Sequence, residues 1–65
     1  MLIKQIEAFV EVVRRGTVSR AADALNVTQP ALTARLHGLE RELGEVLFAR
    51  SGRGVRLTDA GRAFL

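Results

Sequence analysis

The chain has 65 residues, a net charge of +3, 48% hydrophobic residues and no cysteine. Its length allows one small domain, and its composition is typical of a folded soluble domain rather than of a disordered segment. The sequence excludes disulfides and thiolate metal sites, contains no apolar run of membrane-spanning length, and does not begin with the pattern of a signal peptide.

The charge is distributed unevenly along the chain. Residues 1–45 carry equal numbers of basic and acidic side chains, so the whole net charge lies in residues 46–65. Such a basic end favours contact with a polyanion, and a solvated arginine cluster is the alternative interpretation.

Residues 1–15 are predicted to form an amphipathic helix. Its expected apolar face consists of Ile3, Ile6, Phe9, Val10 and Val13. Glu11 is placed to pair with Arg14 or Arg15, and Gly16 follows as the residue that ends the helix.

A second, shorter helix is predicted to end at Leu25, with Thr17 and Ser19 as candidate N-caps. Asn26 stands where a left-handed turn must end this helix, and Val27 follows as an apolar residue beneath the turn. Because so few residues separate this helix from the next, the two must meet at a sharp angle.

Residues 28–43 are predicted to form a third helix, with Thr28 as its N-cap, Pro30 in its first turn and Gly44 at its end. Its apolar seam repeats at helical spacing and consists of Leu32, Leu36, Leu39 and Leu43. Together with the preceding helix, this pattern predicts a helix-turn-helix over residues 18–37.

The face opposite the leucine seam is small near the N-terminal end of the third helix. It carries Pro30, Ala34, His37 and Arg41, flanked by Ala31 and Thr33. Small side chains leave room for another molecule to approach closely, and the alternative is an ordinary exposed face that happens to be small.

Two β-prone runs follow at residues 46–50 and 55–57, and the segment between them contains two glycines. This spacing predicts a β-hairpin in which Val55 and Leu57 face the helices and Arg56 points outward.

Three arginines lie on this short hairpin. Arg50 flanks the turn, Arg53 lies at its tip and Arg56 follows on the second strand. A basic hairpin beside a helix-turn-helix is typical of a wing, and the alternative is charge that serves solubility alone.

The last segment begins a further helix, with Thr58 as N-cap and Asp59 in the first turn, where the helix dipole favours an anion. Its expected apolar stripe consists of Ala60, Ala63, Phe64 and Leu65. Because the stripe runs to the last residue, we expect this helix to continue in a longer protein.

The sequence contains no pattern of an enzyme or of a cofactor site. One histidine and scattered carboxylates give no metal-ligand spacing, and His37 is expected to face solvent or a phosphate. Without Tyr or Trp there is no aromatic platform for single-stranded nucleic acid.

The chain resembles the N-terminal domain of LysR-type transcriptional regulators. The resemblance rests on residues 9–25 (FVEVVRRGTVSRAADAL), 27–33 (VTQPALT), 39–44 (LERELG), 47–50 (LFAR) and 55–61 (VRLTDAG). It implies a mainly α, winged helix-turn-helix fold that reads bacterial promoter DNA in the cytoplasm as a dimer. Residues 1–57 would form the DNA-binding domain and residues 58–65 the start of a linker helix through which subunits pair. Small-molecule effectors would act through a further domain that this chain does not contain.

The resemblance and the chemistry of the side chains give a set of candidate DNA-binding residues: Ser19, Thr28, Gln29, Pro30, Ala31, Thr33, Ala34, His37, Arg50, Arg53 and Arg56. Gln29 is the candidate for direct readout, because a carboxamide pairs bidentately with adenine. Thr33 is expected to meet a thymine methyl or a base acceptor, and Thr28 and Ser19 to bind phosphate. The arginines are expected to hold phosphates, with Arg53 at the tip entering the minor groove or gripping the backbone.

Two other interpretations remain open at this point. A small helical protein-interaction module could use the seam of leucines and the exposed end of the last helix. A winged helix of another regulator class would share the same order of elements.

Overall fold

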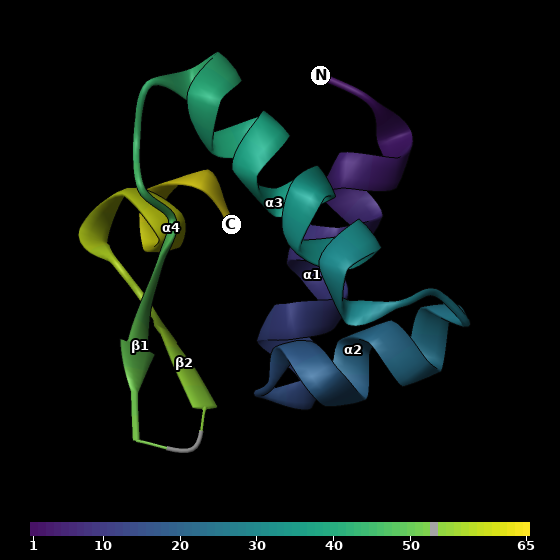
Figure 1. The fold of residues 1–65 in the computed structure, drawn as a ribbon. Coiled ribbons are helices and arrows are strands. Elements are labelled where there is room, and N and C mark those ends of the chain that lie inside the picture. Colours follow the sequence, from purple (N-terminus) through teal and green to yellow (C-terminus); the bar gives the residue numbers. More distant parts are fainter. Residues whose placement is uncertain (53) are drawn as a thin grey trace.

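The computed structural model describes residues 1–52 and 54–65. It contains a helix-turn-helix with a β-hairpin beside it. Along the described residues the elements are α1 (Ile3–Arg15), α2 (Val18–Leu25), α3 (Gln29–Leu43), β1 (Phe48–Ser51), β2 (Gly54–Leu57) and α4 (Asp59–Phe64). Figure 1 shows the three longer helices packed together, the hairpin extending beside them, and α4 at the base of the hairpin. The predicted mainly α, winged helix-turn-helix architecture is confirmed.

The core lies where α1, α2 and α3 cross. Its buried side chains are Ala8, Phe9, Val12, Ala21, Ala22, Leu32, Leu36, Leu39 and Leu47. Small alanines on α2 let the other helices approach closely, and Leu32 and Leu39 of the α3 seam are among the largest fully buried side chains. The predicted seam is confirmed, with Leu43 half-buried at its end.

The ends of the helices follow the local sequence signals. Gly16, Asn26 and Gly44 adopt left-handed conformations, with φ values of 84°, 58° and 69°. Thr28 Oγ1 accepts a hydrogen bond from the Ala31 N–H at 3.2 Å, as its predicted N-cap role requires. These predictions of where the helices begin and end are confirmed.

Of the two candidate caps of α2, the structure selects Thr17. Its Oγ1 accepts a hydrogen bond from the Arg20 N–H at 3.1 Å, whereas Ser19 lies within the first turn of the helix. At the other end of the chain, Thr58 Oγ1 accepts from the Gly61 N–H at 3.0 Å and caps α4 as predicted.

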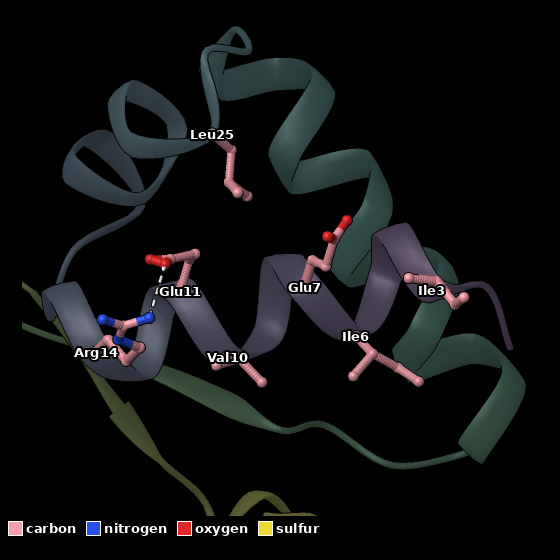
Figure 2. A pocket seen from close by; sticks show the side chains of 7 residues that line it. All are labelled: Ile3, Ile6, Glu7, Val10, Glu11, Arg14 and Leu25. Carbon is pink, nitrogen blue, oxygen red and sulfur yellow. Dashed lines mark ion pairs between the residues drawn. The ribbon is translucent and has the colours of Figure 1, made fainter.

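The predicted apolar face of α1 is partly wrong. Phe9 packs into the core and Val13 against it, but Ile3, Ile6 and Val10 are exposed. Figure 2 shows these three residues on α1 around a hollow that Leu25 of α2 also lines. The core side of α1 is instead formed by a set of residues rotated toward α2 and α3: Ala8, Phe9 and Val12.

Glu11 forms the ion pairs that its spacing predicts. Its carboxylate lies 3.3 Å from Arg15 Nε and 3.7 Å from Arg14 Nη1. The pair with Arg14 is visible in Figure 2. These contacts satisfy a carboxylate that is largely buried at the end of the core.

The hairpin pairs Phe48 with Leu57 and Ser51 with Gly54 in antiparallel register. Its first strand begins two residues later than predicted, because the backbone of Val46 and Leu47 bonds to other elements instead of to β2. Val55 and Leu57 are half-buried against the helices and Arg56 is exposed, as predicted.

The second strand also touches the turn between α1 and α2. The Val55 N–H donates a hydrogen bond to the Gly16 carbonyl at 3.3 Å. A Cβ at Gly54 would lie 2.7 Å from the same carbonyl oxygen, so only glycine permits this close approach. The far end of the hairpin is thereby held against the beginning of α2.

The short helix α4 packs against the same core. The Phe64 ring meets the Phe9 ring edge to face at 5.2 Å, and Phe48 lies 5.2 Å from Phe9 on another side. Ala60 also packs on the core, whereas Ala63 and Leu65 are exposed, so only half of the predicted stripe packs against the core, and that half is partly buried. None of the helices described is both long and apolar enough to cross a membrane.

Candidate functional site

The first two turns of α3 present the predicted small face to solvent. Gln29, Pro30, Ala31 and Ala34 are all exposed, and Thr33 is half-buried at the edge of this face. The leucine seam on the opposite side anchors the helix in the core. Beside Gln29, another molecule can therefore approach the backbone of α3 at Pro30, Ala31 and Ala34, where the exposed side chains are small.

The N-terminal end of α3 carries free hydrogen-bonding capacity. The first turn of any helix exposes backbone N–H groups and a partial positive charge, and Thr28 satisfies only one of these groups. Thr28 itself is exposed, so its hydroxyl remains accessible. Ser19 is exposed as well, on the first turn of α2.

A cleft of about 150 Å³ separates α3 from the hairpin. Its lining includes Thr33 and His37 of α3 and Arg50 of β1, so three of the predicted site residues come together there. His37 is exposed, as predicted. The cleft thus combines a hydroxyl, an imidazole and a guanidinium on two different elements.

The two described arginines of the hairpin lie on opposite faces. Arg50 is paired with Val55 across the hairpin and lines the cleft beside α3. Arg56 is paired with Ala49 and lies near Gly16, in a separate hollow. Cross-strand partners share a face and neighbours along a strand alternate, so these two side chains do not converge.

Both of these arginines are exposed and form no ion pair with any other residue that the structure describes. Their charges are therefore available to an external anion. Arg53, the residue predicted at the tip of the hairpin, lies outside the described residues.

One residue at this site was not identified from the sequence. Glu40 lines the same cleft, one helical turn beyond His37, and its Oε2 accepts hydrogen bonds from the N–H groups of Leu47 and Phe48 at 2.8 and 3.4 Å. The available signal was its spacing from Thr33 and His37, which places all three on one face of α3. A residue that faces the hairpin from a helix is a candidate for holding it.

The described part of the chain contains no group of three or more metal-ligating side chains. The cleft offers an external ligand the Thr33 hydroxyl, the His37 imidazole and the Arg50 guanidinium, while the Glu40 carboxylate is engaged by backbone N–H groups. Exposed donors and a guanidinium suit recognition of an anionic polymer.

Comparison with known proteins places this arrangement in a family. Residues 3–62 match the family model described as bacterial regulatory helix-turn-helix protein, lysR family. The chain is 48% identical over 65 residues to the HTH-type transcriptional regulator TfdS of Cupriavidus pinatubonensis, and 45% identical over 62 residues to the regulator PcaQ of Agrobacterium fabrum. These alignments cover 100% and 95% of the chain but only 22% and 20% of the relatives, so the chain spans about a fifth of their length.

Solved structures agree with this match. The crystal structure of a CbnR_DBD–DNA complex superposes with a TM-score of 0.94 at 45% identity, covering 100% of this chain and 75% of that one. The complex of BenM_DBD with catB site 1 DNA gives a TM-score of 0.92 at 38% identity, covering 98% and 72%. Both similar proteins were crystallised on DNA.

Proposed function

Because the chain belongs to the LysR family of bacterial regulatory helix-turn-helix proteins, we propose that it binds double-stranded DNA sequence-specifically as part of a longer transcriptional regulator. One observation carries the proposal. An exposed helix face of small side chains stands beside a hairpin whose arginine lines the same cleft. The major groove admits an α-helix, and phosphates lie on either side of it.

In this proposal the N-terminal half of α3 enters the major groove. Gln29, exposed at the first position of α3, pairs with an adenine through its carboxamide, and Thr33 meets a thymine methyl or a base acceptor. Pro30, Ala31 and Ala34 allow the helix backbone to approach the bases.

The surrounding groups fix the helix on the DNA backbone. Thr28, Ser19 and the N-terminus of α3 bind phosphates, and His37 faces a phosphate beside the groove. Arg50 reaches a phosphate from the cleft side of the hairpin, and Arg56 reaches another from the opposite face. Arg53 enters the minor groove or holds the backbone.

The longer protein would supply what this chain lacks. Residues 58–65 would begin a linker helix that pairs two copies, residues 1–57 would form the DNA-binding domain, and a further domain would bind a small-molecule effector. We propose a non-enzymatic protein of the bacterial cytoplasm that needs no cofactor to bind DNA. The similarity to TfdS and PcaQ, which are HTH-type transcriptional regulators, supports this assignment.

The first test is binding of this chain to a labelled generic duplex, followed by fluorescence anisotropy at 50 and 200 mM salt. Neutralising several phosphates predicts a steep decline in affinity with salt, with a log–log slope of about −0.9 for each phosphate. Absence of binding at low salt, both for this chain and for a longer one that includes the linker helix, would contradict the proposal and favour the protein-interaction module.

The second test distinguishes recognition of a base by Gln29 from contact with the DNA backbone by Arg50. Once a preferred duplex has been selected, its binding free energy is compared with that of a duplex changed at one base pair. Gln29→Ala should reduce this difference by about 1–3 kcal/mol. Arg50→Ala is the matched control and should weaken all duplexes alike. If Gln29→Ala lowered the affinity for every duplex equally, Gln29 would not read a base.

A further inference from the structure

The segment that joins α3 to the hairpin is a junction of three elements. The Leu47 N–H donates to Glu40 of α3, and the Leu47 carbonyl accepts from the Thr58 N–H at the start of α4, at 3.0 Å. The Val46 carbonyl accepts from the Thr58 hydroxyl. The entry to β1 is therefore held from α3 on one side and from α4 on the other.

Glu40 is the residue of α3 that contacts this junction. It is half-buried, and one carboxylate oxygen accepts from two successive backbone N–H groups, those of Leu47 and Phe48. Charge-assisted hydrogen bonds of this kind are stronger and more directional than neutral ones. They fix the direction in which the chain leaves α3 and enters the hairpin.

We infer that Glu40 is a positioning residue that holds the hairpin at a fixed angle to α3, so that Arg50 reaches the DNA backbone while Gln29 lies in the groove. This inference rests on the proposed function. Glu40 lines the same cleft as Arg50, which places the hydrogen bonds and the arginine on one side of the hairpin.

Glu40 is too far along α3 to read a base beside Gln29. The two residues are 11 positions apart, which corresponds to about 16 Å along a helix axis at 1.5 Å per residue. A carboxylate near phosphates also opposes DNA binding by its charge. A positioning role explains why an acidic side chain belongs on this face, because its oxygen is engaged by backbone N–H groups.

The test compares Glu40→Ala, Glu40→Gln and the matched control Glu45→Ala in the same 65-residue chain. Glu45 lies in the same segment but its side chain is exposed, so its replacement changes the net charge equally and leaves the hydrogen bonds of Leu47, Phe48 and Thr58 in place. Affinity is measured by anisotropy on the preferred duplex and on a scrambled one, over a series of salt concentrations. The angle between the hairpin and α3 is measured in the free protein by residual dipolar couplings, which need no DNA.

Glu40→Ala should weaken both duplexes by about the same factor, roughly tenfold, and reduce the salt slope by about 0.9 as the Arg50 contact is lost. The ratio of the two affinities should stay as in the original chain. Glu40→Gln should restore most of the affinity, because its amide oxygen can accept the same hydrogen bonds, and Glu45→Ala should not weaken binding. In the free protein, Glu40→Ala should change the couplings of residues 48–57 relative to those of α3.

Three results would overturn the inference: unchanged couplings of the hairpin in folded Glu40→Ala, an increase in affinity on loss of the carboxylate, or failure of Glu40→Gln to recover binding. If Glu40→Ala does not fold, the test rests on Glu40→Gln. The inference then requires that this variant keep the hairpin couplings and the salt slope of the original chain. If neither the original chain nor a longer one that includes the linker helix binds DNA, the proposed function fails, while the couplings still report whether Glu40 holds the hairpin.

Discussion

Gly61 and Gly38 both lie within helices, but an added Cβ would meet different neighbours at the two positions. A Cβ at Gly61 would lie 2.3 Å from the Leu47 carbonyl oxygen, and one at Gly38 would lie 2.7 Å from Gln5 Nε2. The first neighbour is backbone that the Thr58 N–H also holds. The second is the far end of a flexible side chain, so the two positions should respond in opposite directions to the same substitution.

Gly61→Ala is expected to destabilise the domain. The Leu47 carbonyl cannot move without disturbing its hydrogen bond from the Thr58 N–H, and the end of the Leu57 side chain, 2.8 Å from the added Cβ, must shift as well. Overpacking of this kind costs about 1–3 kcal/mol. For a domain of this size, each kcal/mol lowers Tm by about 4–8 °C. Thermal unfolding followed by circular dichroism measures the change, and an unaltered Tm would mean that α4 can shift away from Leu47.

Gly38→Ala is expected to stabilise the domain by up to about 1 kcal/mol, because alanine is the better helix former and the Gln5 side chain can turn aside. Gln5 Oε1 also accepts a hydrogen bond from the Leu2 N–H at 3.0 Å, so turning aside weakens the start of α1. The gain should therefore be larger in a Gln5→Ala background than in the original chain, which a double-mutant cycle by urea unfolding measures. Equal gains in both backgrounds would show that Gln5 does not respond to the substitution.

Among the secondary-structure elements, the sequence predicts best where helices begin and end, because short-range interactions determine these positions. Each left-handed residue that ends a helix, and the Thr28 and Thr58 caps, acts within about one turn of its own position. The choice between Thr17 and Ser19 could not be made from the sequence, because both residues have the chemistry of a cap and only the start of α2 distinguishes them.

Asn26 offers a test of the turn between α2 and α3. Its φ of 58° allows the Val27 N–H to donate to the Ala22 carbonyl at 3.0 Å. Left-handed backbone costs an ordinary residue about 1–2 kcal/mol, and a β-branched residue suffers most. Asn26→Val should lower the free energy of unfolding by about that amount, whereas Asn26→Gly should leave it nearly unchanged. Equal losses in urea unfolding of the two variants would instead indicate a role for the asparagine side chain.

Features set by tertiary contacts were harder to predict. The face of α1 that is buried depends on where α2 and α3 lie, so a pattern of apolar residues alone included the exposed Ile3, Ile6 and Val10. The start of β1 depends on Glu40 and Thr58, which are distant in sequence from each other. The opposite faces of Arg50 and Arg56 likewise follow from the cross-strand register, which the sequence did not specify.

At the scale of the whole molecule, size limits what one copy can recognise. The longest dimension of the chain is 27 Å. One turn of DNA is about 34–36 Å long, so a single copy covers less than one turn. Recognition of a longer site would therefore require a second copy, in agreement with the proposed pairing through a linker helix.

The arrangement of charge should be visible in the salt dependence of DNA binding. Arg50 lines the cleft beside α3, whereas Lys4 is exposed in the first turn of α1. The start of the chain lies by the other end of α3, because the N-terminal amino group pairs with Glu42 in its last turn. Arg50 thus belongs to the region proposed to meet DNA, whereas Lys4 lies outside it. Arg50→Ala should reduce the log–log salt slope by about 0.9, the value for one lost phosphate contact.

Lys4→Ala removes the same charge at the far end of α3 and should leave the slope unchanged. Arg56→Ala tests the other face of the hairpin and should reduce the slope by about 0.9 if that face also meets a phosphate. Anisotropy titrations of the three variants on one generic duplex supply all the values. Each of the three substitutions removes one positive charge, so the variants differ only in where that charge lay. If all three reduced the log–log salt slope equally, net charge rather than the placement of the hairpin would govern binding.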